Sequence, residues 1–165
     1  MKELILIRHA KSSWENRALT DFDRPLNYRG QNDAPFMGEK LAASGFVPEL
    51  IITSPAVRTL QTADLFAKAL GYPPDKLIQE PTMYEANIQD LLAIIHKIPD
   101  THERVALFGH NPGMTSLCYV LSLHDVENIP TCGMAVIRFD VQSWQDVVPK
   151  KGEFVMFDYP KRYKT

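Results

Sequence analysis

The chain has few cysteines and no long apolar run, and both absences narrow its functional class. Its two cysteines, Cys118 and Cys132, leave no second pair for a cysteine metal site. Because the chain has no export signal, we expect free thiols rather than a disulfide. Before Arg8 the only apolar run is Leu4 to Ile7, far shorter than a signal peptide core or a membrane span. These absences predict a cytoplasmic protein that does not enter a membrane.

The chain also lacks an excess of charge of either sign. Its 18 lysines and arginines nearly balance 20 acidic residues, for a formal net charge of −2. Any affinity for an anion must therefore come from a local pocket rather than from a global field, and we expect no nucleic-acid partner. We find no internal repeat or low-complexity segment. The length and the ordinary hydrophobic content predict a single domain over residues 1–165.

What the sequence does contain is an alternation of strand and helix patterns. We predict strands at 3–8, 49–53, 76–79, 104–108, 134–139 and 152–157, and helices at 29–44, 54–70, 88–97 and 112–122. Ser54 and Pro55 read as an N-cap followed by a proline at the first helical position, and Gly71 ends that helix. The last two strands follow each other without a helix, which indicates an antiparallel edge. The pattern predicts an α/β fold whose mostly parallel sheet has helices on both faces.

Four basic side chains lie at or just after the ends of three of the predicted strands. Arg8 and His9 follow the first strand, Arg58 lies in the first turn after the second strand, and His110 follows the strand at 104–108. Sheets of this class bind ligands at the carboxyl ends of their strands. We therefore expect these four side chains to form one cluster. The polar stretch Lys11–Asn27 is long enough to carry function, and we expect it to pack above the strand end at His9.

The cluster has the chemistry of phosphoryl transfer. The donor fork of an arginine matches two phosphate oxygens at a time, which makes Arg8 and Arg58 candidate phosphate ligands. A neutral imidazole can attack phosphorus and form a phosphohistidine that water later opens. By residue type either histidine could do this. The rigid strand end favours His9 as the nucleophile, and the helix start after His110 favours that residue as a donor to the phosphoryl group.

Four motifs carry a resemblance to a known family. They are Leu6–Trp14 with the sequence Arg-His-Ala at its centre, Asp23–Leu26 with Arg29-Gly30, Ser54–Ala63, and Gly109–Gly113. In this order they resemble the histidine phosphatase superfamily, and within it the small SixA-type phosphohistidine phosphatases. The resemblance implies a phosphoglycerate mutase-like three-layer sandwich. It also implies that His9 is the nucleophile and that Arg8, Arg58 and His110 form the phosphate pocket.

The sequence departs from the wider superfamily in three ways. Ala10 follows the nucleophilic histidine where most members have glycine, as in the SixA-type branch. The segment 80–96 is too short for the insertion that covers the site in mutases and large phytases. A clear general acid is also missing, and Glu85 is the nearest candidate, with an exposed loop carboxylate as the alternative interpretation. We expect Asp21 and Asp23 to hold the long loop, against Arg24 or Arg29, rather than to act as acids.

These features favour one function over two others. The preferred hypothesis is a metal-independent, cofactor-free phosphatase that hydrolyses phosphohistidine in a partner protein through a covalent intermediate at His9. The first alternative is a phosphomonoesterase for a small phosphorylated metabolite. The second, from a different class, is an inactive module that binds phosphoproteins, although the complete set of four basic residues speaks against it.

Overall fold

The first strand of the chain lies in the middle of the sheet. In the computed structural model, which describes residues 1–164, β1 (Lys2–Arg8) pairs in parallel with β4 (Arg104–Gly109) and antiparallel with β5 (Met134–Phe139). Its apolar residues are fully buried, because both faces of the strand are covered. This double burial explains the continuous apolar run that ends at Arg8.

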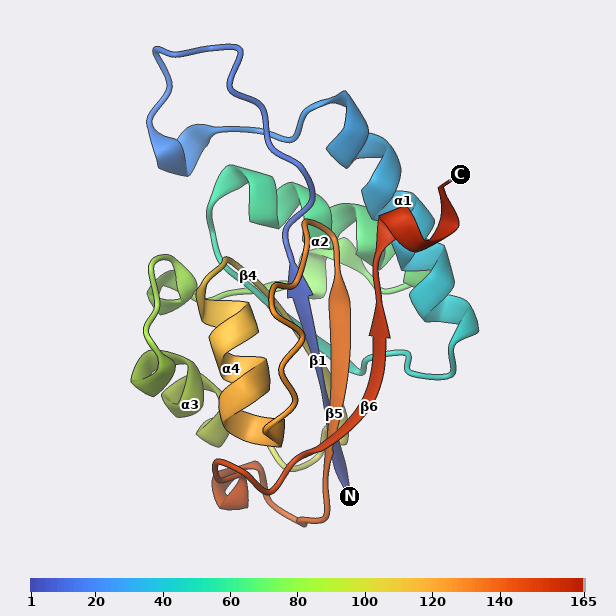
Figure 1. Cartoon of the computed structure of the whole chain (residues 1–165), viewed down its shortest axis with the longest axis vertical. Helices are drawn as coiled ribbons and strands as arrows, with labels where there is room; N and C mark the ends of the chain where they lie inside the picture. Colours follow the sequence, from blue (N-terminus) through green and yellow to red (C-terminus); the bar gives the residue numbers. More distant parts are fainter. Residues whose placement is uncertain (165) are drawn as a thin grey trace.

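The remaining strands extend the sheet on both sides in the order β3-β2-β4-β1-β5-β6. β2 (Leu50–Thr53) runs parallel to β4 and to the short β3 (Ile78–Gln79). β6 (Glu153–Asp158) pairs antiparallel with β5 at the opposite edge. The predicted parallel sheet with an antiparallel edge is confirmed, and the carboxyl ends of β1, β2 and β4 share one rim (Figure 1).

Two pairs of helices cover the two faces of the sheet. α1 (Tyr28–Ala43) and α2 (Val57–Leu70) pack on the face that carries Ile5 and Ile7. α3 (Ile88–His96) and α4 (Gly113–Ser122) pack on the face that carries Leu4 and Leu6 (Figure 1). Because neighbouring side chains of a strand point to opposite faces, β1 contributes to both cores. The predicted three-layer sandwich is confirmed.

The structure corrects two predicted elements. α2 begins at Val57 after an uncapped Ala56, so Ser54 is not its N-cap. The Ser54 hydroxyl instead accepts a hydrogen bond from the amide of Ala56 and lies 2.8 Å from His110. The strand expected at 76–79 is only two residues long, because a single 3-10 turn occupies Pro74–Lys76. Gly71 ends α2, as predicted, and the structure shows it in the left-handed conformation.

The segment 11–27 crosses the rim of the sheet as a loop with local order. Ser12 and Leu26 form an isolated antiparallel bridge at its base, and a 3-10 turn, η1, spans Asp21–Asp23. No helix within residues 1–164 is long and apolar enough to cross a membrane. Thr165, the last residue of the domain expected over 1–165, lies outside the described residues.

Candidate active site

The four basic residues predicted from the sequence meet at the rim of the sheet. β1 and β4 lie side by side with Arg8 opposite Gly109, so His9 and His110 leave the sheet at the same level. Their ring centroids are 5.3 Å apart. Arg58 reaches both from the first turn of α2: its Nε is 3.4 Å from Nε2 of His9, and its Nη2 is 3.5 Å from Nδ1 of His110.

His9 is held in a single tautomer by its own neighbour in the chain. Its Nδ1 lies 2.8 Å from the carbonyl oxygen of Ala10, and because a carbonyl can only accept, Nδ1 must carry the proton. The lone pair is then on Nε2, which faces Arg58. Burial, reinforced by the charges of His110, Arg58 and Arg8, lowers the pKa of His9 to about 3. The ring is therefore neutral at pH 7.

The imidazole of His110 is anchored through Nε2, the nitrogen that does not face Arg58. Its Nε2 lies 2.8 Å from the Ser54 hydroxyl and 3.2 Å from the Thr59 hydroxyl. Burial and the nearby Arg58 lower its pKa to about 4, and the carboxylate of Asp21 partly opposes this shift. His110 is thus also neutral at pH 7, with Nδ1 directed toward Arg58.

Arg8 presents a hydrogen-bond donor that no protein atom in residues 1–164 satisfies. Its Nη1 donates to the carbonyl of Ile129 at 2.9 Å, whereas its buried Nε has no partner within that range. An unpaired buried donor is costly, because it has lost water without gaining another acceptor. A bound anion would supply that acceptor.

Thr62 couples α2 to the residue after His9. Its hydroxyl accepts a hydrogen bond from the amide of Ala10 at 3.0 Å and donates to the carbonyl of Arg58 at 2.7 Å. The threonine is fully buried. The first turn of α2, and Arg58 with it, is therefore held in register with the end of β1.

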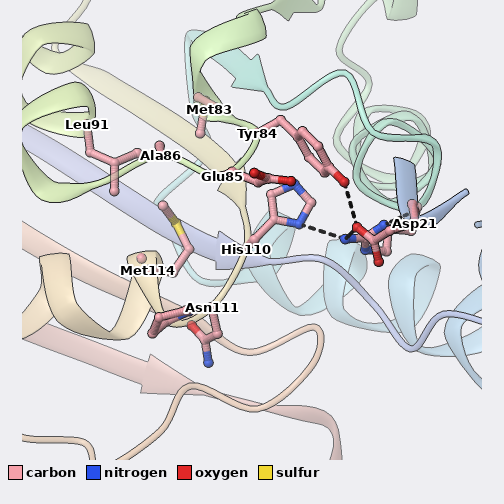
Figure 2. Close-up of a pocket in the computed structure, with 12 residues that line it drawn as sticks. Asp21, Met83, Tyr84, Glu85, Ala86, Leu91, His110, Asn111 and Met114 are labelled. Atoms are coloured by element: carbon pink, nitrogen blue, oxygen red, sulfur yellow. Dashed lines mark hydrogen bonds and ion pairs between the residues drawn. The ribbon is translucent and has the colours of Figure 1, made fainter. Parts of the chain in front are cut away.

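Asp21 is the site residue whose position the sequence did not reveal. Its predicted contact with Arg24 is confirmed, with the guanidinium of Arg24 3.1 Å from Oδ1. In addition, Oδ2 accepts hydrogen bonds from Arg58 at 3.0 Å and from the Tyr84 hydroxyl at 2.7 Å (Figure 2). These donors, Tyr84 first, lower the pKa of Asp21 to about 2, whereas burial and the same carboxylate raise the pKa of Tyr84 to about 12.

No local signal in the sequence pointed to these two contacts. Asp21 is separated from Arg58 by 37 residues and from Tyr84 by 63. The one indication was the length of the loop together with its aromatic and charged residues, which suggested that it packs over the site. Asp23 does not join the cluster: it accepts a hydrogen bond from Thr20 at 2.9 Å on the exposed side of the loop.

A cavity of about 350 Å³ opens above Arg58 and His110. Asp21, Tyr84 and Glu85 form part of its wall, and the start of α4 forms another part (Figure 2). Glu85 is exposed and has the left-handed backbone conformation, with φ of 58°. The structure thus places Glu85 in the wall of the same cavity as Arg58 and His110, although it makes no hydrogen bond to them.

The site is built mainly from arginine and histidine side chains. Across residues 1–164, His, Cys, Asp and Glu side chains form no group of three or more that could hold a metal ion. Cys118 and Cys132 are both buried and free. In the cavity wall, the charge available to an anion comes from Arg58 and from His110 once it is protonated.

Comparison with known proteins identifies this arrangement. Residues 4–92 match the model of the histidine phosphatase superfamily, branch 1. An uncharacterised chloroplast protein of Arabidopsis thaliana is 32% identical over 160 residues, covering 92% of this chain and 72% of the relative. A SixA protein of Agrobacterium tumefaciens, assigned as a phosphohistidine phosphatase, is 27% identical and superimposes with a TM-score of 0.83 over 96% of this chain and 98% of its own. A SixA structure with bound tungstate shares the fold, with a TM-score of 0.84 at 19% identity over 98% of this chain and 99% of its own.

Proposed function

Because the chain belongs to the histidine phosphatase superfamily and is a phosphatase, we propose that it hydrolyses phosphohistidine in a partner protein, with His9 as the nucleophile. The proposal takes residues 1–165 as a single catalytic domain. The observation that supports it most is the combination of a neutral, oriented imidazole at His9 with a nearby Asp21 carboxyl group that is ionised near neutral pH.

His9 has the properties that an in-line attack on phosphorus requires. Its Nδ1 proton is committed to the carbonyl of Ala10, so the lone pair is on Nε2, where it accepts a long hydrogen bond of 3.4 Å from Nε of Arg58. A phosphoryl oxygen would take over that donor and leave the lone pair to attack phosphorus. Because the pKa of His9 is lowered to about 3, the nucleophile needs no deprotonation at neutral pH. The attack would form a bond from Nε2 to phosphorus while the bond from phosphorus to the substrate's imidazole breaks. Water would then hydrolyse the phosphohistidine at His9.

The remaining basic residues would hold the phosphoryl group. Arg58 lies within hydrogen-bond distance of both imidazoles, and the buried Nε of Arg8 lacks an acceptor among the described residues. Charge on the equatorial oxygens of the phosphoryl group is stabilised best by fixed donors of this kind. The dianion would also favour protonation of His110, which would turn its Nδ1 into a further donor.

The leaving group determines which substrates suit this site. An alkoxide is strongly basic and needs a proton in the transition state, whereas imidazole, with a conjugate-acid pKa of about 6.5, can depart already protonated. Asp21 cannot supply a proton near neutral pH, because its pKa is lowered to about 2. Glu85 is the remaining carboxyl group on the cavity wall, and it is exposed. This weak acid assistance favours a phosphoramidate over an alkyl phosphate.

A matched pair of peptides tests the proposal. One peptide carries phosphohistidine and the other carries phosphoserine at the same position, and release of inorganic phosphate is measured for both. We expect faster hydrolysis of the phosphohistidine peptide, and complete loss of turnover in His9→Ala. Label from a ³²P-phosphohistidine peptide should be trapped on His9 of the wild-type protein.

Two results would contradict the proposal. Faster hydrolysis of the phosphoserine peptide, or of a small alkyl phosphate, would favour the phosphomonoesterase alternative. Label trapped on His110, or phosphate release that persists in His9→Ala with the fold intact by circular dichroism, would assign the nucleophile elsewhere.

A further inference from the structure

The guanidinium of Arg58 is held at two different edges. Such a group offers two pairs of parallel donors, one formed by Nε and Nη2 and the other by Nη1 and Nη2. The first edge faces the imidazoles of His9 and His110, at 3.4 and 3.5 Å. At the second edge, Nη1 donates to the backbone carbonyl of Asp21 at 2.6 Å and Nη2 donates to its carboxylate at 3.0 Å. One residue of the long loop therefore occupies the whole edge that points away from the histidines.

Asp21 is itself fixed by a donor from its own loop, Arg24, and by one from another segment, Tyr84. Arg24 donates to Oδ1 from Nε at 3.2 Å and from Nη2 at 3.1 Å. The Tyr84 hydroxyl donates to Oδ2 at 2.7 Å. Arg24 is buried, stacks on Trp14 at 3.5 Å and donates to the Ser12 hydroxyl at 2.9 Å. With its acceptor positions used in this way, the Asp21 carboxylate is committed to the protein rather than to a substrate.

We propose that Asp21 is the positioning residue of the active site, which holds Arg58 so that its Nε and Nη2 edge is presented to a phosphoryl group at His9. This inference rests on the proposed role of Arg58 as a phosphate ligand. A long arginine side chain has many rotamers in water, and a fork that must be ordered during the reaction stabilises charge less well than one that is already ordered. The segment 11–27 then acts as a brace behind the arginine.

A double-mutant cycle tests the inference. The rate of p-nitrophenyl phosphate hydrolysis is measured for the wild type, Asp21→Ala, Arg58→Ala and the double variant. We expect kcat to fall roughly 10- to 100-fold in Asp21→Ala, as for a misplaced positioning contact, and about 10²–10³-fold in Arg58→Ala. If Asp21 acts through Arg58, the double variant should match Arg58→Ala within roughly twofold. Multiplication of the two losses would overturn the inference.

Two further variants separate positioning from a general effect on the loop. Asp23→Asn makes the same charge change two residues away, on the exposed side of the loop, and should keep wild-type kcat. Asp21→Asn keeps the backbone carbonyl contact and one side-chain acceptor, so it should lose less activity than Asp21→Ala. If Asp21→Ala does not fold, the cycle is run with Asp21→Asn. Equal losses in Asp21→Asn and Asp23→Asn would overturn the inference.

An NMR measurement tests whether Asp21 holds Arg58 in place, and it does not depend on enzymatic activity. Hydrogen exchange at Nε of Arg58 should be slow in the wild type and in Asp23→Asn, and clearly faster in Asp21→Ala. Unchanged exchange in Asp21→Ala would contradict the positioning role of Asp21.

Failure of the proposed function can be distinguished from failure of this inference. If the wild type hydrolyses p-nitrophenyl phosphate but not phosphohistidine, the proposed substrate is wrong, and the double-mutant cycle still tests Asp21. If it hydrolyses neither, the proposed function fails, and the exchange rates alone decide whether Asp21 holds Arg58.

Discussion

At the scale of single residues, Arg58 is required for its shape as well as its charge. Its guanidinium lies beside both imidazoles and donates two hydrogen bonds to Asp21. Lysine carries one ammonium group and cannot reproduce a planar fork. We expect Arg58→Lys to recover only part of the 10²–10³-fold loss expected for Arg58→Ala, about the size seen when one donor to a developing charge is removed. Steady-state kinetics with p-nitrophenyl phosphate measure this, and full recovery by lysine would show that charge alone matters.

Glu85 is the carboxyl group in the cavity wall that, unlike Asp21, is not bound by Arg58 and Tyr84, and it remains the candidate general acid. It is exposed, and its left-handed backbone is an uncommon conformation that tends to occur at functional sites. We expect Glu85→Gln to slow phosphoserine peptides by roughly 10²–10⁴, the usual contribution of general acid catalysis, and barely to affect phosphohistidine peptides. Glu39→Gln, on the exposed side of α1, is the control. Equal slowing of both peptides would mean that Glu85 positions the substrate, and no slowing of either would leave it an ordinary surface residue.

At the scale of elements, the sequence predicts what local chemistry determines. The buried run before Arg8 and the left-handed Gly71 define the end of a strand and of a helix, and the structure has both. The predicted start of α2 differs from the observed one, because the Ser54 hydroxyl contacts the amide of Ala56, before the helix, and His110, which follows β4, and caps no amide of α2. The contacts of Asp21 with Arg58 and Tyr84 could not be predicted from the sequence either. Its partners are distant in sequence, and a single sequence carries no periodicity for such contacts.

The junction of α1 with the long loop depends on a glycine. A Cβ at Gly30 would collide with the backbone carbonyl of Lys11, where the loop begins. The N-cap residue Asn27 donates its amide to that same carbonyl and accepts the amide of Gly30 on its side chain. Relief of the collision would move the loop that carries Asp21. We expect Gly30→Ala to lower the free energy of unfolding by about 1–3 kcal/mol, as for other overpacked sites, and to lower kcat as well.

Urea unfolding and p-nitrophenyl phosphate kinetics check this prediction. Glu39→Ala, at an exposed position further along α1, is the control and should retain wild-type stability and activity. Wild-type behaviour of Gly30→Ala would show that the loop does not depend on this close contact.

At the scale of the whole molecule, two cores lie on opposite faces of the sheet and the site lies at its rim, between them. This position buries His9 and partly buries His110, with arginines close to both rings. Their neutral forms are therefore favoured in the folded protein, with pKa values of about 3 and 4. The same arrangement that prepares a nucleophile makes the stability of the protein depend on pH.

The direction of this dependence follows from proton binding. In the unfolded chain a histidine has a pKa of about 6.5, so between pH 6.5 and 4 the unfolded state binds protons at His9 and His110 that the folded state does not. The free energy of unfolding should therefore fall as the pH is lowered through this window, by up to about 1.4 kcal/mol per pH unit for each histidine. Asp21, with a folded pKa of about 2, loses its stabilising effect only at lower pH, below the unfolded value for aspartate.

Urea unfolding at a series of pH values from 4.5 to 8 measures the effect, and single variants assign it. His9→Gln removes one of the two groups, so the slope of unfolding free energy against pH should fall to about half in this window. His110→Gln should act alike, and the slopes should converge above about pH 7, where both histidines are neutral in either state. A wild-type slope that persists in both variants would mean that the folded protein does not lower the pKa values of these histidines, which would contradict the effect of burial described for the site.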